Sequence, residues 1–189
     1  TVTFIALKFG LFTGNGPDCA GFLHYADLEV SDPVFAAHLP VAERLDLPAL
    51  LANLAPRQAN SHKGLYGHVL VVGGDYGFGG AVAMAAEAAL SCGAGLVSVA
   101  TRAEHVSAVL ARTPEVMVHA VANRHELDNL LAGMSVGVIG PGLGQSPWSE
   151  QLLLGVLERD HTLVVDADAM NILGNKQWRG RLAGGTGPV

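Results

Sequence analysis

Short runs of apolar residues recur along the second half of the chain, and each run lacks polar alternation. They predict five strands, near residues 69–73, 96–100, 115–120, 135–139 and 162–166. Runs of this length suit strands that are buried on both faces. The stretches between them have helical patterns that begin near Ala81, Ala103, Arg124, Pro147 and Ala169. Strand–helix alternation of this kind predicts an α/β fold, doubly wound around a mostly parallel sheet.

The first sixty residues follow a different pattern. Thr1–Leu7 and Phe22–Val30 read as two strands separated by a glycine-rich loop. Four prolines interrupt residues 31–60 and leave room for one short helix that begins with Asp46 as its N-cap. We therefore expect three segments: residues 1–30 as one unit, 31–60 as a linker and 61–189 as the α/β domain.

Composition narrows the classes of function. Half of the 189 residues are hydrophobic, 15% are charged and the net charge is -6, so the chain can bury a core and is not disordered. The few basic residues are scattered, which argues against nucleic-acid or anionic-membrane binding and favours small soluble ligands. The apolar stretch 81–100 is broken by Glu87 and Gly93 and does not predict a membrane span. Two cysteines favour a cytoplasmic location, and Cys92 is expected to be buried in a helix.

Three loops follow predicted strands and are the candidates for chemistry. They are Gly73–Gly80, Gly140–Gly144 and Asp166–Asn171. In open parallel sheets, ligands bind outside the carboxyl ends of the strands. Because each loop follows a strand of the same direction, we expect all three to converge in one cleft.

Each loop has more than one interpretation. The glycines either let backbone amides approach a phosphate or a flat ring, or they simply make tight turns. The carboxylates after the last strand either bind Mg²⁺ through water, pair with ribose hydroxyls or cap the next helix. No Walker A sequence is present, and the histidines lack the spacing of a metal site. Four methionines are expected in the core, at Met84, Met117, Met134 and Met170.

Several motifs in register resemble one family. They are His62-Lys63-Gly64 with Gly67, the loop Gly73–Ala81, the segment Ala85–Val97, Gly140–Gly144 and Asp166–Asn171. From about Ser61 to Gly174 the chain is similar to the ADP/ATP-dependent NAD(P)H-hydrate dehydratases, which are ribokinase-like proteins. Residues 1–21 resemble the end of the epimerase domain that is fused upstream in the bifunctional NAD(P)H-hydrate repair enzymes. The chain thus looks like a fragment across the joint of the two domains, with an incomplete ribokinase-like fold.

This resemblance implies a metabolite-repair lyase. Hydrated NADH or NADPH would be the substrate, ADP or ATP the co-substrate, and Mg²⁺ a possible companion. The family pattern implies that Ala81 and Gly144 contact the hydrate and that Lys63 meets its phosphates. Other substrate-binding candidates are Gly80, Gly142, Asp168 and Asn171. The family's catalytic Asp and nucleotide-binding segments have no counterpart in residues 1–189, so no catalytic residue is assigned and we expect these residues to be inactive alone. In the full-length form we expect a homo-oligomer.

Two other functions remain open. The first is a ribokinase-like kinase of a small molecule such as a pyrimidine or a sugar alcohol. The second is a truncated segment that acts as a binding or oligomerisation module without catalysis. The epimerase-like N-terminal residues favour the repair lyase over the kinase, and a turnover assay separates an enzyme from a binding module.

Overall fold

The computed structural model describes all residues except 53, 176–177 and 179–189. It divides into two compact units, Thr1–Arg57 and Gln58–Val189. Each unit is described by itself.

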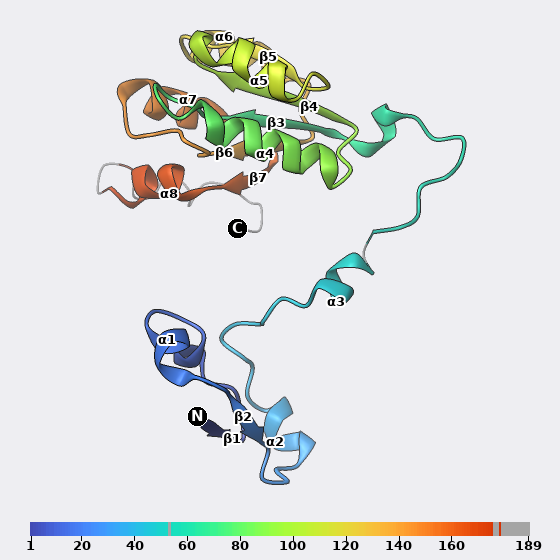
Figure 1. The fold of residues 1–189 in the computed structure, drawn as a ribbon, viewed down its shortest axis with the longest axis vertical. Coiled ribbons are helices and arrows are strands. Elements are labelled where there is room, and N and C mark those ends of the chain that lie inside the picture. The colour runs from blue at the N-terminus through green and yellow to red at the C-terminus, as the bar shows by residue number, and fades with distance from the viewer. Residues whose placement is uncertain (53, 176–177, 179–189) are drawn as a thin grey trace. The chain divides into compact units, whose positions relative to one another are not determined.

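The second unit is built on a five-stranded parallel sheet (Figure 1). Its strands are β3 (His68–Val72), β4 (Leu96–Thr101), β5 (Met117–Ala120), β6 (Val136–Ile139) and β7 (Thr162–Val165). They lie in the order β5-β4-β3-β6-β7, and every neighbouring pair is parallel. The predicted α/β fold with a parallel sheet is therefore confirmed, and no strand end differs from its prediction by more than two residues.

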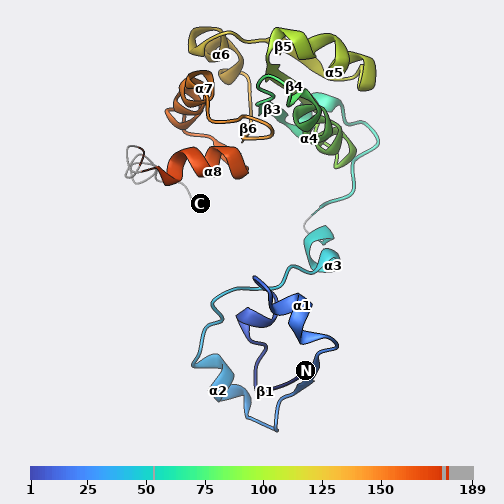
Figure 2. The same ribbon diagram turned by 60° about the vertical axis from the view of Figure 1, so that its left-hand side comes forward.

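Helices cover both faces of this sheet. They are α4 (Gly79–Ser91), α5 (Val106–Arg112), α6 (Arg124–Leu131), α7 (Pro147–Leu157) and α8 (Ala167–Gly174), with 3-10 turns η2 (Lys63–Tyr66) and η3 (Ala103–His105). Figure 2 shows α4 and α5 on one side of the strands and α6, α7 and α8 on the other. Local signals start two of them: the side chain of Asn123 accepts from Glu126 N at the start of α6, and Ser146 forms a capping box with Ser149 before α7.

Alternate residues of the central strand serve two separate cores. Val71 packs with residues of α4 and α5, whereas Leu70 and Val72 pack with residues of α6, α7 and α8. All three side chains are at most 1% exposed. This is the burial on both faces that an unbroken apolar run predicts.

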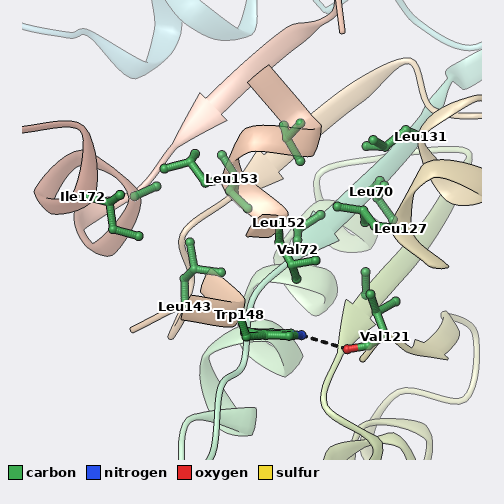
Figure 3. Packing of buried hydrophobic residues seen from close by; sticks show 14 of the residues in the cluster. Leu70, Val72, Val121, Leu127, Leu131, Leu143, Trp148, Leu152, Leu153 and Ile172 are labelled. Atoms are coloured by element: carbon green, nitrogen blue, oxygen red, sulfur yellow. Dashed lines mark hydrogen bonds between the residues drawn. The ribbon is translucent and has the colours of Figure 1, made fainter. Parts of the chain in front are cut away.

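Trp148 connects α7 to the segment after β5. Its ring is 5% exposed, and its indole Nε1 donates a hydrogen bond of 2.9 Å to the carbonyl oxygen of Val121 (Figure 3). A buried indole N–H needs such a partner, because leaving it unpaired costs about 1–3 kcal/mol. The bond fixes the orientation of this ring close to the carboxyl ends of the strands.

The first unit has little regular structure. Strands β1 (Val2–Phe4) and β2 (His24–Ala26) form a parallel pair, accompanied by the turn η1 (Phe9–Leu11) and the helices α1 (Gly16–Ala20), α2 (Asp32–Ala36) and α3 (Leu47–Leu51). The helix predicted after Asp46 is confirmed as α3, with the Asp46 side chain accepting from Ala49 N. The predicted strand 22–30 is too long, because Leu28 and Glu29 adopt left-handed backbone angles that cannot continue a strand.

Two predictions about burial are wrong. Helix α4 ends at Ser91, so Cys92 is its C-cap and is exposed. Of the four methionines, Met134 is buried, whereas Met84 on the outer face of α4 is 57% exposed, and Met117 and Met170 are exposed as well. Residue type alone does not tell which face of an element a side chain occupies.

Among the residues that the structure describes, no helix combines the length and the apolar character needed to cross a membrane.

Candidate functional site

The strand order reverses direction between β3 and β6. From β3 the chain continues to β4 on one side, and it later returns to place β6 on the other side of β3. The loops that follow these two strands touch, since Gly74 N donates to Pro141 O at 2.9 Å and Asp75 N donates to Gly142 O at 2.8 Å. Such a reversal point is where doubly wound sheets bind ligands.

The third loop joins the other two. Asp166 N donates to Ile139 O at 2.9 Å, and Gly144 N donates to Asp168 Oδ2, also at 2.9 Å. The three loops therefore meet at the carboxyl ends of the strands, as the sequence predicted. This end of the sheet, called the site edge, is the candidate functional site.

Several glycines of these loops are required by the protein's own packing. A Cβ on Gly73 would lie 2.2 Å from Pro141 O, and one on Gly142 would lie 2.7 Å from the Cβ of Phe78. Gly142 also has a positive φ of +57°, which strains any other residue. For these positions the tight-turn interpretation is sufficient.

Gly80 is different. A Cβ added there would meet no atom within 4 Å, and no positive φ demands a glycine. It lies in the first turn of α4, whose N-cap Phe78 offers no side-chain hydrogen bond. The first amides of a helix lack intrahelical partners and attract anions. At Gly80 the space that a side chain would occupy is therefore open, whereas at Gly79 it is filled by His105, and the amide of Ala81 donates to Phe78 O at 3.1 Å.

Ala81 and Gly142 are neighbours across two loops. A Cβ on Gly142 would stand 3.0 Å from the Cβ of Ala81. Gly144 lies two residues after Gly142 in the same loop and has a φ of +66°. A Cβ added to Gly144 would lie 3.5 Å from Asp75 Oδ2, which is an ordinary contact distance. The structure therefore brings together Ala81, Gly142 and Gly144, and whether they contact a ligand stays a prediction.

Asp168 has a structural bond of its own. Its carboxylate accepts from Gly144 N and so ties α8 to the loop after β6. The sequence left open that a carboxylate of this loop caps the next helix. Asp166 is the N-cap residue of α8, but its side chain makes no cap hydrogen bond. Asn171 follows one turn after Asp168 on the same helix and is exposed.

Lys63 lies at the opposite end of the strands, where β4 begins. Its carbonyl oxygen would be 1.8 Å from a Cβ on Gly95, which directly precedes β4. The candidate site follows the other end of the strands, and six residues of β4 at about 3.3 Å each separate the two ends. That distance exceeds the reach of a lysine side chain. The structure does not support the expected contact of Lys63 with phosphates bound at the three loops.

The sequence did not single out an ion pair that lies at the heart of the site. Arg102 Nε donates to Asp75 Oδ1 at 2.8 Å, and the two side chains are 15% and 12% exposed. Ser146 Oγ donates to the other carboxylate oxygen at 2.7 Å. Burial raises the pKa of Asp75, but the hydrogen bonds from Ser146 and Arg102 lower it by more. The pKa of Asp75 is thus below its ordinary value of 3.8, and its charged form links three loops.

Two aromatic rings contact the same arginine. The guanidinium carbon of Arg102 lies 4.4 Å from the ring centroid of Tyr76 and 4.1 Å from that of Trp148. A signal for this residue was present in the sequence: Arg102 lies two positions after the predicted strand 96–100, just as Asp75 lies two positions after the predicted strand 69–73. Because ligands bind outside the carboxyl ends of parallel strands, this position alone makes Arg102 a candidate site residue.

Comparison with known proteins decides the family. Residues 69–183 match the carbohydrate-kinase-type family model that is described as NAD(P)H-hydrate dehydratase. The chain belongs to the NAD(P)H-hydrate dehydratase family. The three loops at the candidate site lie within this match.

Named relatives agree with this assignment. The bifunctional NAD(P)H-hydrate repair enzyme Nnr of Coxiella burnetii is 51% identical over 173 residues, which cover 92% of this chain and 36% of that protein. The ADP-dependent (S)-NAD(P)H-hydrate dehydratase of Lactiplantibacillus plantarum is 49% identical over 120 residues, 62% of this chain and 43% of that protein. The chain thus spans about a third of the length of the bifunctional relative.

Solved structures support the ribokinase-like fold. A ribokinase-like superfamily protein from Enterococcus faecalis superposes with a TM-score of 0.63 at 31% identity, covering 72% of this chain and 50% of that one. The ADP/ATP-dependent NAD(P)H-hydrate dehydratase of Bacillus subtilis, co-crystallised with ATP and Mg²⁺, gives 0.55 at 27% identity, covering 65% and 44%.

Proposed function

We propose that this chain is the dehydratase part of an NAD(P)H-hydrate repair lyase, which converts hydrated NADH or NADPH back to NADH or NADPH. One observation supports this most directly: the first turn of α4, which has no side-chain cap and is open at Gly80, follows the loop after β3 where that loop meets the loops after β6 and β7. A dinucleotide with two phosphates and a bulky hydrated ring suits an edge where bare backbone can approach it.

Backbone groups do most of the binding in this proposal. The amides at the start of α4 would receive a phosphate or the amide of the damaged ring, and Ala81 and Gly142 would border the space beside it. Asp168 acts indirectly, by holding Gly144 in place. Since these groups are already fixed by hydrogen bonds between loops, binding costs little reorganisation.

The co-substrate is proposed to be ADP or ATP, following the ADP-dependent relative and the ATP-bound structure. A bound nucleotide would supply the phosphoryl group that converts the hydroxyl of the hydrate into a leaving group. Mg²⁺ is not assigned a site here, because the described residues hold no group of three or more His, Cys, Asp or Glu placed to bind a metal. Asp168 accepts a hydrogen bond from Gly144 N through its Oδ2 atom.

Fusion to an epimerase is the second part of the proposal. We assign residues 1–30 to the end of an NAD(P)H-hydrate epimerase domain, 31–60 to a linker and 61–189 to the dehydratase domain. The match to the bifunctional Coxiella burnetii enzyme supports this, because its 173 residues extend well beyond the second unit. A separate small-molecule kinase would not need the first unit.

Binding of hydrated NADH tests the proposal. Calorimetric titration of the chain should give saturable binding that Gly80→Leu weakens, because a side chain there enters the space left for the ligand; overpacking costs about 1–3 kcal/mol. Gly174→Leu is the matched control: it too meets nothing within 4 Å, but it lies at the far end of α8. Failure of the unaltered chain to bind, or equal affinity of both variants, would overturn the proposal.

Location and assembly complete the proposal. A cytoplasmic location is supported by Cys19 and Cys92, which are both free and exposed. We also propose that the full-length protein forms a homo-oligomer. Its binding partners are proposed to be small-molecule substrates. Light scattering of the full-length protein after size exclusion measures this assembly directly.

A further inference from the structure

Tyr76 and Trp148 both contact the guanidinium of Arg102 in the candidate site. The guanidinium carbon lies over both rings, at 4.4 Å from the Tyr76 centroid and 4.1 Å from the Trp148 centroid. Trp148 is buried at 5% exposure, and Tyr76 is exposed at 60%. One face of the tyrosine ring rests on the arginine, while most of its surface is in solvent.

Hydrogen bonds hold both Arg102 and Trp148 in place. Arg102 is held by Asp75 through a 2.8 Å bond, and Trp148 is held by its bond to Val121 O. Asp75 in turn accepts from Ser146. An exposed tyrosine ordinarily turns between rotamers, but a ring supported on a fixed guanidinium loses part of that freedom before any ligand arrives.

We propose that Tyr76 is a stacking platform for the planar heteroaromatic base of a nucleotide or dinucleotide, and that Arg102 is the positioning residue that holds this ring. This inference rests on the proposed function for its ligand class. Tyr76 lies in the loop that leads into α4, four positions before Gly80, where the start of the helix is proposed to receive phosphate. Tyrosine and nucleobases both present flat π-surfaces, and a preordered ring lowers the entropy cost of stacking.

Ligand fragments distinguish which base stacks. Adenosine monophosphate contains adenine but no nicotinamide, and reduced nicotinamide mononucleotide contains nicotinamide but no adenine. Hydrated NADH contains adenine together with the damaged nicotinamide ring. Each is titrated against the unaltered chain, Tyr76→Ala and Tyr76→Phe. Phe22→Ala is the matched control, because it removes a ring that is 90% exposed in the other unit.

Tyr76→Ala should weaken binding of hydrated NADH and of one fragment by about five-fold or more. Tyr76→Phe should retain the affinity, since the ring and not the hydroxyl makes the contact, and Phe22→Ala should change nothing. Arg102→Lys should weaken the same fragment, because an ammonium group lacks the planar surface that supports the ring. Loss for adenosine monophosphate identifies adenine as the stacked base, and loss for the mononucleotide identifies nicotinamide.

Two results would overturn the inference and are distinguishable from each other. If Tyr76→Ala binds all three ligands as the unaltered chain does, the platform is wrong while the proposed function stands. If the unaltered chain binds none of them, both the platform and the proposed function are wrong. Because Tyr76 is largely exposed, the alanine variant should keep its thermal unfolding midpoint, which confirms that any loss reflects binding.

Discussion

The two units of the chain use apolar residues in different ways. In the second unit, two cores cover the two faces of a five-stranded sheet. In the described part of the first unit, Thr3 and Ala20 are buried, while Phe22, Leu39 and Val41 are each 90% exposed. A hollow of about 710 Å³ in this unit is lined mostly by apolar side chains, together with Lys8, His38, Glu43 and Arg44.

This difference shows that residues 1–57 do not cover their own apolar side chains. A parallel strand pair with three register positions has two faces but too little covering structure to bury either one. In the second unit, each face of the sheet is closed by helices that supply leucine, valine and alanine side chains. The stability of the chain should therefore come from residues after Arg57.

Hydrogen exchange should reveal the largest contrast. The amide of Val71 in the central strand β3 should exchange at least about a thousand-fold more slowly than that of Thr3 in β1, because core strands open only with about the global free energy of unfolding. Both residues are buried, so exposure alone does not predict this difference. Equal protection of the two amides would mean that the first unit is as stable as the second.

Core truncation comes next in expected size. Leu152→Ala removes a fully buried side chain of α7 and should lower the free energy of unfolding by about 2–5 kcal/mol. Leu39→Ala, the same change at a 90% exposed position of the first unit, should stay within about 0.5 kcal/mol. Denaturant unfolding followed by tryptophan fluorescence measures both. Similar losses for the two variants would contradict the contrast between the units.

The ion pair at the site should contribute less than the core and should depend on pH. Asp75→Asn leaves Arg102 with a weaker partner in a largely buried place, and we expect a loss of about 2 kcal/mol near neutral pH. The control Glu87→Gln, which breaks an exposed pair with Arg112, should cost less than about 1 kcal/mol.

The sign of the pH effect follows from the pKa of Asp75. Because folding lowers this pKa, the unfolded chain binds the proton more readily, and the stabilisation is present above the ordinary pKa of 3.8. It is lost as the pH falls through the lowered folded value. The stability advantage of the unaltered chain over Asp75→Asn should shrink in that range, and an advantage that grows with acid would refute the assignment.

Gly80→Ala should have the smallest effect on folding. The position is helical and open, so alanine should leave stability unchanged or raise it by up to about 1 kcal/mol. Gly73→Ala on the same loop should destabilise the chain, because its Cβ would stand 2.2 Å from Pro141 O. Thermal unfolding of the two variants measures whether the fold tolerates a side chain at each position. A marked loss of stability in Gly80→Ala would mean that the fold itself requires this glycine.

Local patterns were sufficient for the elements of the second unit. Each apolar run predicted a strand, and α6 and α7 begin at Arg124 and Pro147 as expected, each preceded by a polar capping residue. The carboxyl-end rule also predicted that the three loops meet. These features depend on periodicity and on bonds within a few residues, which a single sequence displays directly.

The tertiary structure decided what the site contains. Only the strand order β5-β4-β3-β6-β7 places the loop after β3 between those after β4 and β6, where Asp75 meets Arg102, 27 positions away, and Ser146, 71 positions away. It also places Lys63 at the opposite end of the strands and separates glycines that packing requires, such as Gly73, from the open Gly80. The sequence by itself thus determined the elements and their common edge. Which side chains share that edge depended on how distant strands pair, because that pairing follows from burial of the whole sheet and not from any local pattern.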